Sequence, residues 1–236
     1  MKAAKKAGRI ASDGLISMKI EDGVGVIAEV NCETDFAARD ENFLAFAESV
    51  AERAHGSRES DVEQLGMEAE REALVQKIGE NCSVRRIAAF DGGVSAYRHT
   101  NGKIGVLVQL EGGDDELGKD VAMHIAATNP QVVSPDDAPE DVVAKEREIY
   151  TAQAADSGKP PEIVEKMIDG RIRKFLAEIS LTEQPFVKDG DIKVGKLLKD
   201  KGATIKQFVR FEVGEGIEVE EEDFAAEVAA QLKGGD

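Results

Sequence analysis

The sequence contains one local pattern twice, and this duplication constrains the fold more than any other feature. Residues 25–30 (GVIAEV) and 105–110 (GVLVQL) match position for position, and each follows a strand-like segment and a turn signal. Each also leads into a segment with apolar residues at helical spacing, at 40–54 and 115–127. A β-hairpin joined to a helix must bury its apolar face against another layer. We therefore predict an α+β fold with two related subdomains, each built from an antiparallel sheet and packed helices.

The second copy is interrupted by an insertion. Residues 129–139 contain three prolines, and two helical segments, 140–155 and 162–179, flank a Pro- and Gly-containing break. Two adjacent helices with a short break between them predict an antiparallel helical hairpin of the coiled-coil type. A glycine-rich hinge and a C-terminal helix, 223–232, follow the last predicted strand. The predicted domains are an N-terminal core at 1–90, a discontinuous C-terminal core at 91–132 and 180–213, the hairpin insertion at 133–179, and a C-terminal module at 214–236.

One connection has no counterpart in the other copy. Residues 31–39 (NCETDFAAR) follow the first matched strand, whereas only 111–114 (EGGD) follow the second. In one interpretation Thr34 or Asp35 starts the next helix and Phe36 enters the core. In the other, Asp35 and Phe36 point outward as a probe for a partner. A core phenylalanine would be expected to have an aromatic counterpart in the second copy, which has none, so the residues alone leave the two interpretations level.

The acidic composition limits the classes of partner. Acidic residues outnumber basic ones 47 to 30, for a net charge of −17, whereas phosphate binding requires clustered cations. We therefore expect no direct nucleic-acid binding. No apolar run is long enough for a membrane span, and the basic start lacks the apolar stretch of a secretory signal. Cys32 and Cys82 lie far apart in the sequence and show no CxxC pattern, so we expect reduced thiols in a cytoplasmic protein.

The sequence predicts no enzymatic activity, no cofactor and no metal site. Its three histidines, His55, His99 and His124, lie in separate elements, and neither HExxH nor GxxxxGK[ST] occurs. The one catalytic alternative pairs Cys32 with His99, since both lie near matching hairpins. It has no third residue to orient the base.

The sequence resembles the elongation factor Ts family, the bacterial guanine-nucleotide exchange factors of elongation factor Tu. The resemblance covers nearly the whole chain. It is carried by residues 2–8 (KAAKKAG), 29–36 (EVNCETDF), 77–81 (KIGEN), 104–108 (IGVLV), 158–160 (GKP), 170–171 (GR), 184–186 (QPF) and 210–216 (RFEVGEG).

The resemblance implies a function without bond chemistry. Asp35 and Phe36 would insert into the GTPase near its magnesium and switch regions and promote GDP release, and the complex could itself dimerise. Two departures from the family pattern are expected: the small N-terminal helical module that usually precedes the residues at Lys2 would be missing, and Ala37 stands where the family usually has valine. The residues implied to bind the partner are Thr34, Asp35, Phe36, Ala37, Ile78, Gly79, His99, Phe224 and Val228.

An alternative of a different class is an acidic scaffold or chaperone-like adaptor. It would use the helical hairpin as its interaction arm and would have no exchange activity.

Overall fold

The structure, a computed structural model, describes residues 6–155 and 158–218. It is mixed α and β, with six α-helices and small antiparallel sheets in this part of the chain. The predicted α+β class is confirmed. The predicted C-terminal helix, with Phe224 and Val228, lies outside the described residues.

Two three-stranded sheets form the centre of the molecule, and both are antiparallel. In each sheet, the middle strand contains one of the two matched segments. The next α-helix in the chain packs on the same sheet. The first sheet has the order β1 (Asp13–Glu21), β2 (Val24–Cys32), β3 (Cys82–Asp91). The second has the order β4 (Val94–Arg98), β5 (Ile104–Glu111), β8 (Thr204–Glu212).

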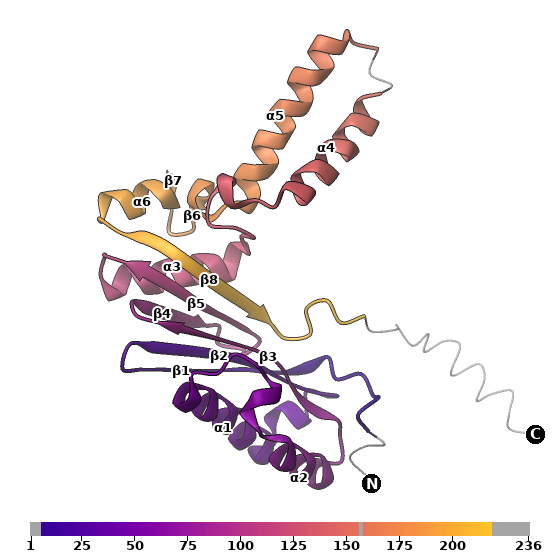
Figure 1. Ribbon diagram of the computed structural model, residues 1–236, viewed down its shortest axis with the longest axis vertical. Helices are drawn as coiled ribbons and strands as arrows, with labels where there is room; N and C mark the ends of the chain where they lie inside the picture. Colours follow the sequence, from indigo (N-terminus) through magenta and orange to yellow (C-terminus); the bar gives the residue numbers. More distant parts are fainter. Residues whose placement is uncertain (1–5, 156–157, 219–236) are drawn as a thin grey trace, which may run out of the picture.

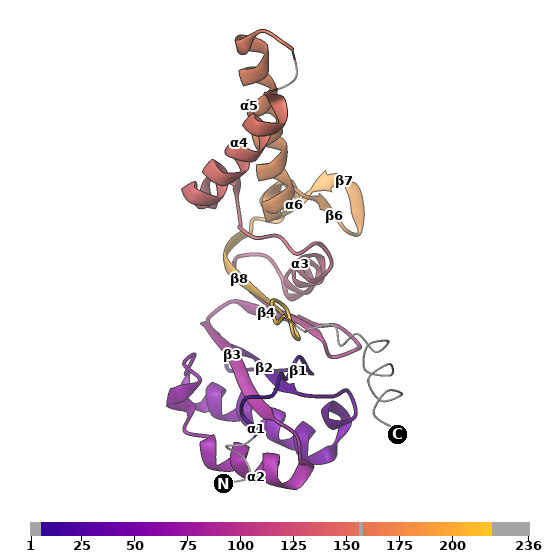
Figure 2. The ribbon, with the colours of Figure 1, turned by 90° about the vertical axis from the view of Figure 1, so that its right-hand side faces the viewer.

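The sheets pack face to face between two layers of helices (Figures 1 and 2). Helices α1 (Glu41–Ser57) and α2 (Glu68–Ile78) cover the outer side of the first sheet, and α3 (Asp115–Thr128) covers the second. Every residue of β2 is buried, because this strand has a helix on one face and the other sheet on the opposite face. Alternate residues of β2 therefore belong to different cores. The contact between the sheets is built on Ile16, Ile27, Leu107 and Phe211.

Matched glycines allow the two sheets to approach closely. A Cβ on Gly25 would lie 2.4 Å from a methyl carbon of Val94 in the second sheet. A Cβ on Gly105 would lie 2.6 Å from a methyl carbon of Ile16 in the first. Both distances are shorter than side-chain contacts permit. The repeated glycine at the start of each matched strand thus has a packing function that periodicity alone did not reveal.

The insertion forms a pair of helices that projects from the second sheet's end of the molecule (Figure 1). Helices α4 (Glu140–Ala154) and α5 (Pro161–Ile179) lie side by side and are joined by an ion pair of 2.7 Å between Arg147 and Asp169. Few of their residues are buried, among them Ile168 and Ile172 on α5. This narrow apolar stripe explains why the pair extends away from the cores rather than packing on them.

Local signals located most elements to within a few residues. Helix α1 was predicted at 40–54 but continues to Ser57, because Arg58 adopts the left-handed conformation that ends it. The strand-like segment before the second matched segment forms β4 over Val94–Arg98 only. Two short strands, β6 (Pro185–Phe186) and β7 (Asp189–Lys193), precede helix α6 (Val194–Asp200) and were not predicted. They are too short for an alternating pattern to stand out.

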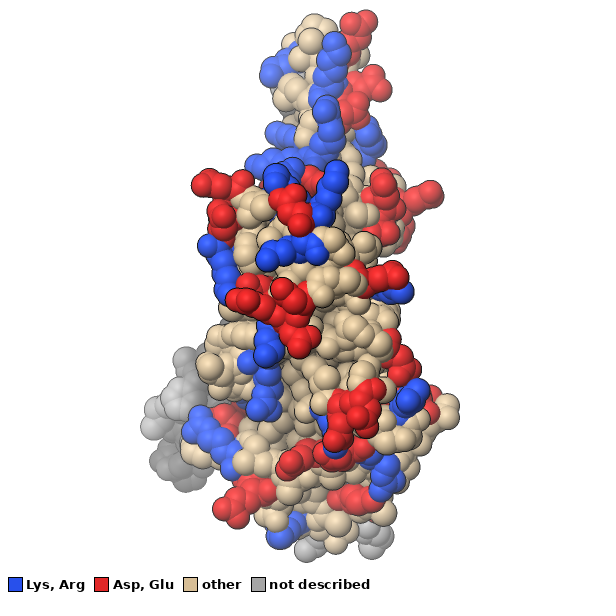
Figure 3. Space-filling model, turned by 90° about the vertical axis from the view of Figure 1, so that its left-hand side faces the viewer, with Lys and Arg blue, Asp and Glu red and all other residues tan. Residues whose placement is uncertain are grey.

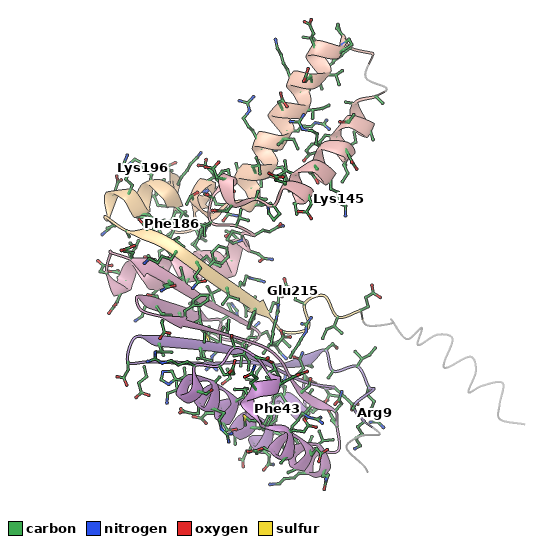
Figure 4. The ribbon with its side chains drawn as sticks, viewed as in Figure 1. Arg9, Phe43, Lys145, Phe186, Lys196 and Glu215 are labelled. Carbon is green, nitrogen blue, oxygen red and sulfur yellow. The ribbon has the colours of Figure 1, made fainter. Side chains whose placement is uncertain are left out.

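A buried histidine connects α3 to the residues on either side of β6. The Nδ1 atom of His124 accepts a hydrogen bond of 3.1 Å from the backbone N–H of Val187, so the ring proton lies on Nε2, which donates to Gln184 at 2.9 Å. Phe186, labelled in Figure 4, lies beside the imidazole with 6.0 Å between ring centroids. The ring is fully buried and neutral in this arrangement.

Acid should weaken the fold through this histidine. Burial lowers the pKa of His124 and outweighs the hydrogen bond to Gln184, which raises it. Because the unfolded chain takes up the proton more readily, stability is complete above pH ~6.5 and falls as the pH drops below it, by at most about 1.4 kcal/mol per pH unit. Urea unfolding between pH 8 and pH 5 measures this slope. A slope that is unchanged in His124→Gln would contradict the assignment.

Candidate partner-binding site

The connection between β2 and α1 carries Asp35 and Phe36 on the surface. Phe36 is 80% exposed, more than any other large hydrophobic residue in the described part of the chain. Ala37 and Ala38 are 5% and 8% exposed and pack into the core beneath α1. The two alanines occupy the inner side of the short 3₁₀ turn Ala37–Arg39. The core interpretation of Phe36 is therefore wrong. Ala37, which the resemblance included among the partner-binding residues, has its side chain in the core instead.

Hydrogen bonds to Thr34 hold this connection in place. Its backbone N–H and its hydroxyl donate to the two carboxylate oxygens of Glu80, at 3.1 and 2.8 Å. The same hydroxyl accepts from the N–H of Ala37 at 3.2 Å, and the Thr34 carbonyl accepts from the N–H of Ala38. Thr34 thus starts the 3₁₀ turn and not the helix that follows it. Asp40 then caps α1 by accepting from the N–H of Asn42 at 2.8 Å.

The end of α2 places Glu80 opposite Thr34. Gly79 ends that helix with φ +88°, a backbone conformation that glycine adopts without strain, and Ile78 before it is partly buried against the first core. Lys6 donates to the carbonyl of Gly79. Ile78 and Gly79 therefore contact the β2–α1 connection indirectly, by placing Glu80 beside Thr34. Sequence reasoning did not identify Glu80 as the support of Thr34, because its partner is 46 residues away in the chain.

His99 shares a cleft with the probe. The β4–β5 turn and the β2–α1 connection border a hollow of about 640 Å³, lined among others by Asp35, Arg39, Leu44, His99 and Lys103. His99 is exposed and its Nδ1 accepts a hydrogen bond of 3.4 Å from the N–H of Asn101. Asp35 is paired with Arg39 at 2.9 Å. The structure thus brings together two predicted residues that are far apart in the sequence.

Leu44 adds an apolar side chain to this cleft. It is 45% exposed on α1 and was not among the predicted site residues. The available signal was that Leu44 lies off the apolar stripe of its helix, whose buried positions include Phe43, Phe46, Ala47 and Val50. A leucine on the polar side of an amphipathic helix has no role in the core of its own chain.

The catalytic alternative finds no support in the geometry. Cys32 is fully buried under α1 and its Sγ donates to the carbonyl of Thr34 at 3.2 Å, whereas His99 lines the exposed cleft. Burial raises the pKa of the Cys32 thiol to about 12. A thiol in this state supplies very little thiolate for nucleophilic attack.

Residues 6–155 and 158–218 contain neither a cluster of metal-binding side chains nor a membrane-spanning helix. No group of three or more histidine, cysteine, aspartate or glutamate side chains there is arranged to hold a metal ion. None of the helices in this part of the chain is long and apolar enough to cross a membrane.

Comparison with known proteins places these features in a family. The family described as "Elongation factor TS" matches residues 33–215. The protein named "Elongation factor Ts" of Hahella chejuensis (strain KCTC 2396) is 61% identical over 240 residues, which cover 99% of this chain and 84% of that protein. The protein of the same name from Teredinibacter turnerae (strain ATCC 39867 / T7901) is 58% identical, covering 98% of this chain and 82% of its own length. The one from Francisella tularensis subsp. novicida (strain U112) is 54% identical, covering 99% and 84%. With this identity over nearly its whole length, the chain belongs to the elongation factor Ts family of translation elongation factors.

Proposed function

We propose that the protein is a guanine-nucleotide exchange factor that binds an elongation factor Tu-type GTPase and promotes release of its GDP. The observation that carries the proposal is the outward presentation of Asp35 and Phe36 on a hydrogen-bonded turn. No cofactor or bond chemistry is required.

The exposed phenyl ring is suited to act as an anchor. Large aromatic side chains on a surface supply much of the binding energy when a partner buries them. The turn beneath Phe36 is held by Thr34 and Glu80, so little conformational freedom is lost on binding. The alanines beneath it remain in the core. Binding energy from the ring is thus available to drive a change in the partner.

Asp35 provides the negative charge of the probe. GDP is held in such GTPases largely through its phosphates and Mg²⁺, so a carboxylate and a ring that displace the groups organising the metal weaken nucleotide binding. By linkage, the exchange factor is itself bound less tightly while GDP is present, by the same factor. We propose that the cleft with His99 and Leu44 receives a second element of the GTPase.

In the proposed function, each part of the chain has a place in the complex with the GTPase. Two related subdomains, 1–90 and 91–132 with 180–213, would present the probe and the His99 turn together. The helical hairpin at 133–179 is the insertion, and the module at 214–236 would bind the GTPase through Phe224 and Val228. A cytoplasmic location and a dimer of the complex accompany this function.

Release of a fluorescent GDP analogue from the partner GTPase tests the proposal. The GTPase is loaded with the analogue, chased with unlabelled GDP, and followed with and without this protein. We expect faster release that saturates with the concentration of the protein. Release that stays at the intrinsic rate at saturating protein would refute the exchange function. Cys32→Ser should leave the acceleration intact, because the exchange mechanism does not use the thiol.

The adaptor alternative is supported by the projecting hairpin. Ile149 and Ile163 on α4 and α5 are 42% and 43% exposed, and lysines and arginines gather over the upper part of the face in Figure 3. Acidic and basic side chains are mixed over the lower layers. An adaptor would bind partners through the hairpin without changing GDP release, so the same measurement separates the two functions.

A further inference from the structure

The two cysteines of the sequence meet across one pair of strands. Cys32 ends β2, Cys82 begins β3, and their Cα atoms are direct partners in the antiparallel register. Both side chains are fully buried in the same core, beneath α1. Directly opposed residues in such a pair have Cα atoms about 4.5–5.5 Å apart, and disulfides span about 4.4–6.8 Å between Cα atoms. The backbone therefore already has the spacing that a disulfide requires.

The cysteines form the base of a frame that supports the probe. Cys32 donates through Sγ to the carbonyl of Thr34 at 3.2 Å, and Cys82 donates to the carbonyl of Glu80 at 3.8 Å. Thr34 and Glu80 are joined to each other by the two hydrogen bonds described above. We call these four residues the probe frame. Both thiols are thus hydrogen-bonded to the two residues that the frame joins.

While the probe frame is closed, the thiols are protected. Burial raises the pKa of Cys32 and of Cys82 to about 12, and the neighbouring Cys82 contributes to the shift of Cys32. Oxidants react with the thiolate rather than the thiol. The closed frame therefore favours the reduced state, and both cysteines are free thiols in the structure.

We infer that Cys32 and Cys82 are a modification site, a dithiol that a peroxide converts into an intramolecular disulfide when the probe frame opens. One thiolate attacks a peroxide oxygen, the O–O bond breaks, and hydroxide leaves, which forms a sulfenic acid. The second thiolate attacks that sulfur and displaces a second hydroxide as the S–S bond forms. The two sulfurs lose two electrons to the peroxide, and the two thiol protons complete two water molecules. A dithiol reductant reverses the change.

The disulfide would link β2 to β3 directly below the probe. It closes a long loop of chain that contains α1 and α2, and such a link stabilises mainly by restricting the unfolded chain. Phe36 is not one of the four residues of the probe frame, so we expect it to keep its exposure in the disulfide form. The expected effect is a higher melting temperature, which does not depend on the exchange function.

Treatment of the full chain with hydrogen peroxide, followed by alkylation in denaturant and intact-mass measurement, tests the site. The wild type should lose the mass of two hydrogen atoms, gain no alkyl group and melt at a higher temperature, and dithiothreitol should reverse all three. Cys32→Ser and Cys82→Ser are matched controls that cannot form the link. Glu80→Ala removes the bonds to Thr34 and should speed the oxidation roughly tenfold, while the protein stays folded.

Other outcomes would overturn the inference. Two alkylated cysteines after peroxide treatment, in both the wild type and Glu80→Ala, would show that the thiols do not react. Sulfinic acid or linked dimers in place of the internal disulfide would show that the sulfurs cannot reach each other. A disulfide that forms equally fast with and without Glu80 would exclude the probe frame as the controlling element.

Discussion

Replacing Asp35 and Phe36 together by alanine is expected to abolish most of the acceleration of GDP release without lowering the stability of the protein. Phe36 is 80% exposed and Asp35 makes only an exposed ion pair with Arg39, so their removal should change the free energy of unfolding by no more than about 0.5 kcal/mol. If the ring is a binding anchor, its loss costs about 2 kcal/mol or more, which is roughly a thirtyfold weaker contact.

The matched control is Ile20→Ala. Ile20 is also a large apolar side chain on the surface, 44% exposed. It pairs with the start of β2, whereas the probe follows the end of that strand. Stopped-flow release of the fluorescent nucleotide and thermal unfolding should be recorded for both variants. Normal exchange by the double variant, or a marked fall in its melting temperature, would contradict the assignment of the probe.

Replacing Glu29 by alanine is expected to cost about 3 kcal/mol of unfolding free energy, because it leaves two arginines without the buried charge that pairs with them. Glu29 lies on β2, facing the second sheet, and is fully buried. Its carboxylate accepts from Arg85 at 3.0 Å, from Arg86 at 2.5 Å and from the N–H of Gly214 at 2.9 Å. Urea unfolding measures the loss.

The same carboxylate connects the first sheet to the chain that leaves β8. Arg86 lies 4.3 Å from the ring centroid of Phe211 and pairs with Glu215 at 3.3 Å, a residue labelled in Figure 4 where the chain leaves the two sheets. Burial raises the pKa of Glu29, but the hydrogen bonds from Gly214, Arg85 and Arg86 together lower it by more. The net shift of the pKa is therefore downward. Its stabilising contribution is therefore present above the carboxyl group's ordinary pKa and is lost as the pH falls through the folded value.

The duplication offers a matched control for Glu29. Gln109 occupies the corresponding position of β5, and its exposed amide donates to the carbonyl of Asp91 and accepts from Gln207 at 2.8 Å. Gln109→Ala should cost less than about 1 kcal/mol, because water can replace an exposed hydrogen bond. Equal losses for Glu29→Ala and Gln109→Ala would show that the carboxylate contributes no more than its neutral counterpart.

Most elements could be predicted because their signals are local. Helix α1 was predicted from apolar residues at helical spacing over 40–54, and this signal depends on residues within one or two turns of each other. The α+β class followed from strands and helices that alternate along the chain. Strands β6 and β7 escaped prediction because neither is long enough to display a period. The residue-level assignments of Phe224 and Val228 remain predictions.

The candidate site could be predicted only in part. The residues alone left Phe36 undecided between the core and the surface, since the type of a side chain does not say which way its backbone turns. In the structure, Ala37 and Ala38 occupy the core positions of this connection, and Phe36 is left on the surface. Glu80 could not be predicted either, because it follows α2 and meets Thr34 only in the folded chain. Leu44 could not be predicted because it lines a cleft with His99, which is distant in the sequence.

By itself, the sequence determined the α+β class, the repeated hairpin-and-helix pattern and the unmatched connection at 31–39. Periodicity, turn residues and capping act over a few neighbouring positions, so these features can be predicted locally. The tertiary structure alone decided that Phe36 is exposed, that Glu80 supports Thr34, and that Cys32 faces Cys82. Each of these facts depends on which strand ends and helix ends meet. That pairing is set by the joint packing of two sheets and their helices, which no local window of the sequence contains.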